Sequence, residues 1–203
     1  MSRNSKTVAE RNRAEVITNA ARLIRRDGTG VPLSDLMAAA GLTKGGFYKQ
    51  FGSKDELVGL AATDAFSEIL ALMGRLRDEA ADTADAREAL LTEYLSTMHR
   101  DDPGSGCANA ALATDAARAG DGSPLREAYR TGITTTLTKL ESYYDDDRRR
   151  NAINTLAAMV GAISLARATA GTPLSDEILE TVRQTLMADP GKTDVPLSTP
   201  PIA

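Results

Sequence analysis

The stretch LSDLMAAAGLTKGGFYKQFGSKDEL, residues 33–57, decides the fold of this chain. It predicts a short helix over 33–40, a glycine-marked turn, a second short helix over 43–50 and a longer helix that starts after Ser53. Thr43 is expected to cap the second helix through its side-chain oxygen. This order of elements is typical of a helix-turn-helix, in which the second short helix enters the major groove of DNA.

Within this stretch, the residue types divide between a buried and an exposed face. Phe47 and Phe51 are one helical turn apart, so both can point inward. Each glycine costs a helix about 1 kcal/mol relative to alanine, a cost that close approach of the backbone to DNA would justify. Hydroxyls and ammonium groups suit phosphate oxygens, and lysine also reaches guanine edges. The residues predicted to bind DNA are Thr43, Lys44, Gly45, Gly46, Tyr48, Lys49 and Lys54. The simpler alternative is a loop with surface lysines.

The charge of the chain is unevenly distributed. Residues 1–54 carry 10 Lys/Arg and 4 Asp/Glu, a balance of +6, whereas residues 55–203 carry 14 and 24, a balance of −10; together they give the net charge of −4. A chain with this asymmetry can direct its basic end toward phosphates. Uneven solvation of the surface is the alternative.

Over residues 10–60 the sequence resembles the TetR family of bacterial transcriptional regulators. The pattern AAGLTKGGFYKQFGSKDEL carries this resemblance. It implies phosphate contacts from Thr43, Tyr48 and Lys54. It also implies that Lys44, Gly45 and Lys49 face the bases.

The expected fold class is all-α. An N-terminal three-helix helix-turn-helix domain over residues 1–55 precedes a helical domain over 56–188, and the proline-rich tail 189–203 is predicted to be disordered. The resemblance implies that the second domain binds a ligand and dimerises through its last two helices. Apolar periodicity predicts helices outside the opening stretch over residues 10–26, 85–99, 107–119, 124–144, 148–169 and 176–188.

The last two predicted helices carry apolar stripes that suit a symmetric four-helix bundle in a homodimer. The alternative is that both stripes are buried within one subunit, because a stripe does not identify its partner. The predicted dimer contacts are Ile153, Leu156, Val160, Ile163, Ile178, Val182 and Leu186.

Cys107 opens the helix predicted over 107–119, where the helix dipole favours a thiolate. Gly106-Cys107 is similar to the Gly-Cys start of the sixth helix in one TetR subgroup, some of whose members sense electrophiles through that cysteine. The alternative interpretation is a small apolar residue packed in the core.

A second group of candidates has helical spacing suited to lining an effector cavity: Tyr94, Met98, Tyr129 and Leu137. Such stripes are also common in ordinary cores, so both interpretations stay open. His99 lies at a predicted helix end and is expected to be a surface or capping residue rather than a ligand contact.

Composition narrows the function classes. Apolar residues make up 42% and charged residues 26%, as in soluble globular proteins. One Cys and one His exclude an internal disulfide and an ordinary structural zinc site, so neither cofactor nor metal is expected. The polar N-terminus and the lack of a long apolar run predict no secretory signal, no membrane span and a cytoplasmic location.

These patterns favour a dimeric, ligand-responsive transcriptional repressor. Its expected partners are a palindromic double-stranded DNA operator, a small-molecule or reactive effector and a second copy of the chain. An activator or a constitutive DNA-binding protein without a ligand is the alternative. A helical-bundle enzyme is disfavoured because no catalytic set or phosphate-binding loop is visible.

Overall fold

The computed structural model describes residues 3–188, and this part of the chain is entirely helical without strands. The predicted disorder of residues 189–203 lies outside the described residues. The elements are α1 (Arg3–Asp27), α2 (Leu33–Ala39), α3 (Lys44–Tyr48), α4 (Lys54–Glu79), α5 (Thr83–Tyr94), α6 (Thr97–Asp101), the 3₁₀ turn η1 (Pro103–Ser105), α7 (Ala108–Arg118), α8 (Pro124–Glu141), α9 (Arg148–Ala168) and α10 (Pro173–Met187).

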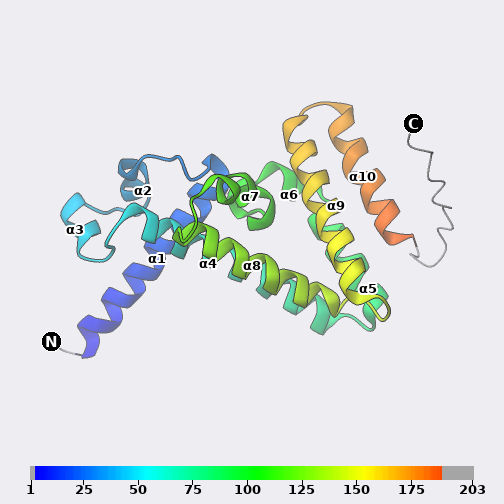
Figure 1. Ribbon diagram of the computed structural model, residues 1–203, viewed down its shortest axis with the longest axis horizontal. Helices are drawn as coiled ribbons and strands as arrows, with labels where there is room; N and C mark the ends of the chain where they lie inside the picture. Colours follow the sequence, from blue (N-terminus) through cyan, green and yellow to red (C-terminus); the bar gives the residue numbers. More distant parts are fainter. Residues whose placement is uncertain (1–2, 189–203) are drawn as a thin grey trace.

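Two long helices, α4 and α8, run side by side along the length of the molecule, with α1–α3 at one end and the α9–α10 hairpin at the other (Figure 1). Gly59 of α4 lies against Pro124, and Gly132 of α8 lies against Phe66. A Cβ atom at either glycine would overlap the neighbouring helix. These two glycines therefore allow the close approach that connects the two ends of the protein.

The turn between α2 and α3 has the hydrogen bonds of a Schellman motif. Gly41 has φ of +62°, the left-handed conformation that favours glycine. Its amide donates to the Ala38 carbonyl at 3.1 Å, and the Leu42 amide donates to the Met37 carbonyl at 2.8 Å. The glycine break expected between the two short helices is present at Gly41.

One predicted helix, over residues 85–99, is divided in two. The chain leaves the helix at Leu95, and Ser96 caps α6 by accepting a hydrogen bond from the His99 amide at 3.1 Å. His99 Nδ1 also bonds to the Tyr94 carbonyl at 2.6 Å, which satisfies a backbone group at the end of α5. Apolar periodicity missed this break because a serine is tolerated inside a helix and the cap is visible only once the chain has turned.

Other helix ends differ from the sequence prediction by small shifts. The α1 helix begins at Arg3, several residues before the predicted start at residue 10. The α3 helix ends at Tyr48 rather than at residue 50. The α10 helix begins at Pro173, which occupies the first helical turn where the missing amide hydrogen costs nothing.

The buried apolar residues form two clusters. The first joins α1–α4 to α7 and the start of α8, and the second joins the distal half of α4 to α5, α8, α9 and α10. The first cluster continues across position 55 through Leu57 and Ala61 and includes Leu112 of α7. The helix-turn-helix end is therefore packed directly onto the rest of the protein.

Within the described residues, α4 is long and apolar enough to cross a membrane by length and composition alone, with mean hydropathy of 1.5. This corrects the expectation that the chain has no apolar segment long enough to span a membrane. However, 44% of the apolar window is buried inside the protein. Phe66 and Met73 of α4 each belong to one of the two clusters, as expected for a central core helix.

Candidate nucleic-acid interface and internal cavity

The short helix α3 is fixed from beneath by aromatic packing. Phe47 and Phe51 are fully or almost fully buried, with ring centroids 5.5 Å apart. The guanidinium of Arg13 in α1 lies over the Phe51 ring at 4.8 Å. Arg13 Nη2 also forms an ion pair with Glu56 of α4 at 3.5 Å. These contacts hold the end of α3 between α1 and α4 despite its short length.

The opposite side of α3 faces solvent. Thr43, Lys44, Gly45 and Lys49 are exposed, and Tyr48 has 55% of its surface accessible. Thr43 Oγ1 caps the helix by accepting a hydrogen bond from the Gly46 amide at 3.2 Å. Two ammonium groups, two hydroxyls and the start of a helix therefore share one exposed surface, a combination that suits phosphate oxygens and base edges.

The two adjacent glycines of α3 have different surroundings. A Cβ atom at Gly46 would lie 3.2 Å from Thr43 Oγ1 and crowd the cap. At Gly45 nothing lies within 4 Å of such an atom, and the residue has an ordinary negative φ. Gly45 therefore has no intramolecular reason to lack a side chain, as expected for a position that a binding partner approaches closely.

Lys54 has a different environment from the lysines of α3. Its side chain is half-buried, and Nζ donates a hydrogen bond to the Thr29 carbonyl at 3.0 Å. It lies at the start of α4, next to the cap formed by Ser53, whose Oγ accepts from the Glu56 amide at 3.0 Å. The Glu56 carboxylate accepts from the Gly52 amide at 2.7 Å, one residue before the partner expected in a capping box.

The loop between α1 and α2 is bound from the opposite side by α7. Asp115 Oδ2 accepts hydrogen bonds from the Thr29 amide at 2.7 Å and from Thr29 Oγ1 at 2.9 Å. Asp115, 86 positions away in sequence, and Lys54 therefore both hold Thr29 in place. This contact links the helix-turn-helix to α7, and sequence analysis missed it because no local pattern pairs Thr29 with Asp115.

Residues 16–61 match the family model described as bacterial regulatory proteins, tetR family. This match covers α2, α3 and the residues that anchor them. Over these residues the chain has the helix-turn-helix domain of the TetR family. The match supports a DNA-binding transcriptional regulator of that family.

Solved structures of TetR-family regulators have the same fold over most of the chain. A regulator from Chloroflexus aurantiacus is 26% identical, with a TM-score of 0.75 and coverage of 89% of this chain and 94% of that one. A regulator from Cytophaga hutchinsonii is 22% identical with the same TM-score and coverage. Escherichia coli NemR in its reduced form is 19% identical, with a TM-score of 0.74 and coverage of 86% and 94%. No curated protein sequence matches this one.

A cavity of about 210 Å³ lies where α1, α4, α5, α6 and the start of α7 meet. Three of the predicted effector residues, Tyr94, Met98 and Cys107, line this cavity. Tyr129 does not; it packs on the first cluster, and its hydroxyl donates to the Asn109 carbonyl at 3.0 Å. Leu137 packs on the second cluster. For Tyr129 and Leu137 the core interpretation therefore describes the structure better.

Cys107 is the N-cap residue of α7 and is buried, with 1% of its surface exposed. Its thiol accepts a weak contact from Asn109 Nδ2 at 3.5 Å, and its amide donates to His99 Nε2 at 3.0 Å. The packing interpretation therefore describes its surroundings, since Cys107 belongs to the second cluster and also lines the cavity, whereas a sensing role for the thiol stays a prediction.

His99 is a half-buried residue of the cavity wall rather than a surface residue. Nε2 accepts from the Cys107 amide, so Nδ1 carries the proton and donates to the Tyr94 carbonyl. Burial lowers the pKa of His99, and the positive charge of Arg167 lowers it further, against the opposing effect of the Tyr94 carbonyl. His99 is thus held neutral and joins the start of α7 to the end of α5.

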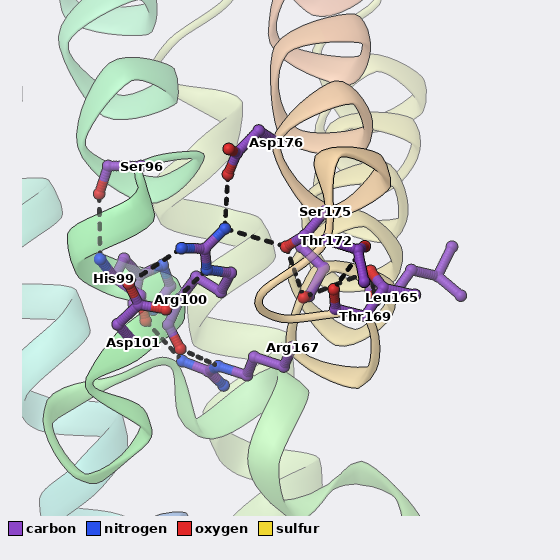
Figure 2. Close-up of polar contacts among 11 residues, drawn as sticks. Ser96, His99, Arg100, Asp101, Leu165, Arg167, Thr169, Thr172, Ser175 and Asp176 are labelled. Carbon is purple, nitrogen blue, oxygen red and sulfur yellow. Dashed lines mark hydrogen bonds and ion pairs between the residues drawn. The ribbon is translucent and has the colours of Figure 1, made fainter.

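Two arginines join α6 to the last two helices (Figure 2). Arg167 of α9 donates from Nη2 to the His99 carbonyl at 2.8 Å and from Nε to the Arg100 carbonyl at 3.2 Å. Arg100 Nη1 donates to Ser175 at 3.0 Å and to Asp176 at 2.6 Å, both in α10. The helix that carries two cavity-lining residues, Met98 and His99, is therefore attached to both helices of the distal hairpin.

The predicted dimer contacts do not share one exposed face. Leu156 and Ile163 are buried within the protomer, with 6% and 0% of their surfaces accessible. These two assignments are corrected, because α9 uses that side to pack on its own second cluster. Val160, Ile178, Val182 and Leu186 are half-buried against the same cluster. Ile153 is exposed at 45%, and the hairpin also exposes Leu165 and Leu174, which the sequence did not single out.

Proposed function

We infer that this TetR-family regulator is a dimeric repressor that binds DNA and dissociates from it when a small molecule binds. The observation that carries this inference is the pairing of an exposed basic recognition surface on α3 with a separate cavity that reaches α1. Thr43, Lys44, Gly45, Gly46, Tyr48, Lys49 and Lys54 are the proposed DNA-binding residues. In this assignment Lys54 exchanges its hydrogen bond to Thr29 for a phosphate.

The proposed operator is a palindromic duplex bound by two copies of the chain. The second copy is proposed to cover the exposed apolar residues of the α9–α10 hairpin, Ile153, Leu165 and Leu174. A Cβ atom at Gly161 of α9 would meet nothing within 4 Å, so the helix offers a place where a partner helix can pack closely. Two-fold symmetry then places two recognition helices in successive major grooves of one DNA face.

The effector site is proposed to be the cavity of about 210 Å³. Its wall touches the DNA-binding end directly, because the η1 turn packs on the last turn of α1 near Arg22 and Arg26. Its other wall, α6, is bound to the dimerising hairpin through Arg100 and Arg167. A ligand that favours a different arrangement of α6 and η1 would shift the spacing of the two recognition helices.

A gel-shift titration of the DNA that flanks the protein's own gene, repeated at several salt concentrations, tests DNA binding. We expect affinity to fall steeply with salt, since cationic groups on α3 displace counterions from phosphates. A response that is flat in salt would contradict the interface. The oligomeric state, measured by sedimentation for the wild type and for Ile153→Glu, tests the dimer, which the variant should dissociate.

An activator or a constitutive DNA-binding protein is the second candidate. Both would use the same recognition surface on α3 as a repressor. They differ from a ligand-released repressor in what a ligand in the cavity does to DNA binding and transcription. Transcription from the flanking promoter, measured with and without the gene for this protein, separates repression from activation. A location in the cytoplasm and the absence of catalysis follow from the same proposal of a DNA-binding role.

A further inference from the structure

Three polar atoms in the wall of the cavity have no hydrogen-bond partner among the described residues. They are Arg25 Nε, Arg25 Nη2 and Tyr94 Oη, and all three are buried. Arg25 and Tyr94 each have only 4% of their surface accessible. Leaving a buried donor unpaired costs free energy that native proteins rarely leave uncompensated. Such atoms around a cavity point to a ligand that supplies the missing partners.

The unpaired atoms of Arg25 form one edge of its guanidinium. The other terminal nitrogen, Nη1, forms an ion pair with Glu68 at 2.7 Å. Nε–H and one Nη2–H point in parallel on the remaining edge, a fork that an oxygen acceptor can occupy. Arg25 lies in the last turn of α1, so this fork belongs to the helix that supports α3.

Tyr94 presents a third donor. Burial and the neighbouring Cys107 raise the pKa of Tyr94 well above its ordinary value, so the phenol keeps its proton. Since every unpaired atom of the cavity wall has a hydrogen to donate, the missing group is an acceptor. A ligand whose polar group only donates, such as an ammonium, would leave both Arg25 donors unpaired.

The charges around the cavity decide whether that acceptor is charged. Glu68, Glu93 and Asp102 line the cavity, while Arg25 is the cation among the lining residues and is already paired. His99, the remaining titratable lining residue with a shifted pKa, is held neutral. Arg167 lies behind the wall, where it is already bonded to the His99 and Arg100 carbonyls. A carboxylate ligand would therefore become the fourth carboxylate of a wall whose neighbouring guanidinium groups already have partners. An uncharged acceptor avoids this repulsion.

The rest of the wall is apolar, with Ile69, Leu72, Leu90 and Met98 facing the cavity. From these observations we propose that the effector is a compact, uncharged, largely apolar molecule with a carbonyl oxygen. Its carbonyl accepts hydrogen bonds from the Arg25 fork and from Tyr94, and its apolar body packs on α4 and α5. Because the donor atoms are closed to water, entry of a ligand has to move neighbouring side chains, and Met98, exposed at 71%, is the most exposed apolar residue of the wall.

This inference rests on the proposal that the cavity is the effector site, and its test measures ligand binding apart from DNA release. Four probes share a phenyl ring and similar size: acetophenone, 1-phenylethanol, benzoate and benzylamine. Saturation-transfer NMR and calorimetry on the full-length protein without DNA give their affinities. We expect acetophenone to bind at least about tenfold more tightly than benzoate and benzylamine, with the alcohol between them.

Variants connect that preference to the named donors. Tyr94→Phe removes the unpaired hydroxyl, and Arg25→Lys keeps the positive charge but removes the fork. Each should weaken acetophenone about tenfold and leave benzylamine unchanged. Tyr94→Phe should melt at or above the wild-type temperature, because it removes a buried unpaired group. Tyr129→Phe is the matched control: it loses a hydrogen bond outside the cavity and should retain acetophenone affinity.

Tighter binding of benzoate or benzylamine than of acetophenone would overturn the assignment of an uncharged carbonyl compound. Binding of none of the four probes, or equal binding by wild type and both cavity variants, would overturn it as well. A separate gel shift with acetophenone distinguishes the two proposals. If acetophenone binds through Tyr94 and Arg25 but leaves the DNA complex intact, the ligand chemistry stands and the proposed control of DNA binding fails.

Discussion

The recognition surface and the cavity of this regulator are built in opposite ways. The recognition surface comes from a single run of sequence. Phe47 and Phe51 are buried on one side of this run, and Tyr48 is exposed on the other. The cavity takes residues from α1, α4, α5, α6 and the start of α7, and it leaves donors of Arg25 and Tyr94 unpaired. The comparison teaches that an exposed surface can be encoded locally, whereas a cavity between helices depends on long-range packing.

Tyr48→Ala has the largest expected effect on this comparison, because it removes one group from the locally encoded surface. Loss of a hydrogen bond to a charged phosphate is worth roughly 1.5–3 kcal/mol, so affinity for DNA should fall about 10- to 100-fold. Fluorescence anisotropy with several operator sequences measures the loss, which should be uniform because phosphates carry no sequence information.

Two observations would contradict that assignment for Tyr48. One is a loss confined to a single operator sequence, which would indicate a base contact. The other is equal DNA affinity for Tyr48→Phe and wild type, which would exclude the hydroxyl. The melting temperature should change little in either variant, since Tyr48 is 55% exposed.

Asp115→Ala tests the link between the two regions. The substitution leaves the Thr29 amide without its acceptor, and we expect a loss of about 1–3 kcal/mol in the free energy of unfolding. Hydrogen exchange at the Thr29 amide should accelerate, and DNA affinity should fall as the α1–α2 loop loosens. Asp115→Asn keeps an acceptor oxygen and should retain most of the protection. Unchanged exchange at Thr29 in Asp115→Ala would show that Lys54 alone holds the loop.

Gly45→Ala separates folding from recognition at one position. The added methyl meets nothing within 4 Å and favours helix, so stability should rise by up to about 1 kcal/mol. DNA affinity should fall, because the methyl occupies the space of an approaching groove. Chemical denaturation and anisotropy on the same preparation measure the two opposite changes. DNA affinity equal to wild type would show that no partner approaches this atom.

The smallest expected effect is the titration of His99 in the cavity wall. Its pKa is lowered in the folded protein, so the unfolded chain takes up a proton first as the pH falls. The stabilisation from neutral His99 is therefore present above its ordinary pKa of about 6.5 and is lost as the pH falls below that value. Denaturation at a series of pH values should show a steeper loss for wild type than for His99→Gln. Parallel pH profiles for the two proteins would contradict the buried neutral form.

Much of the DNA-binding end was predictable, because its determinants are local. Gly41 ends a helix in the left-handed conformation, Thr43 and Ser53 cap the helices that follow them, and two phenylalanines one turn apart pack on the same side. Each of these rules relates residues within a few positions of one another. The DNA contacts assigned to the exposed residues remain predictions, since they concern a partner and not the fold.

The distal half was less predictable for the same physical reason. An apolar stripe on α9 says that one side is buried, but it does not say by what, and Leu156 and Ile163 are covered by the protomer's own helices. The break between α5 and α6 depends on Ser96 and His99 bonding to backbone atoms after the chain has turned. Tyr129 was assigned to a cavity from its spacing, yet its hydroxyl bonds to the Asn109 carbonyl outside the cavity wall.

The sequence by itself determined an all-helical chain with a helix-turn-helix, capped by short-range hydrogen bonds and basic on the exposed side of α3. Only the tertiary structure decided which groups surround the cavity, because burial of Arg25 beside Tyr94 needs α1 and α5 to meet. It also decided that Asp115 would hold Thr29 and that Arg167 would bind the end of α6. Interactions between residues close in sequence determine the helices and turns, whereas contacts between distant residues form only when the packed helices bring them together.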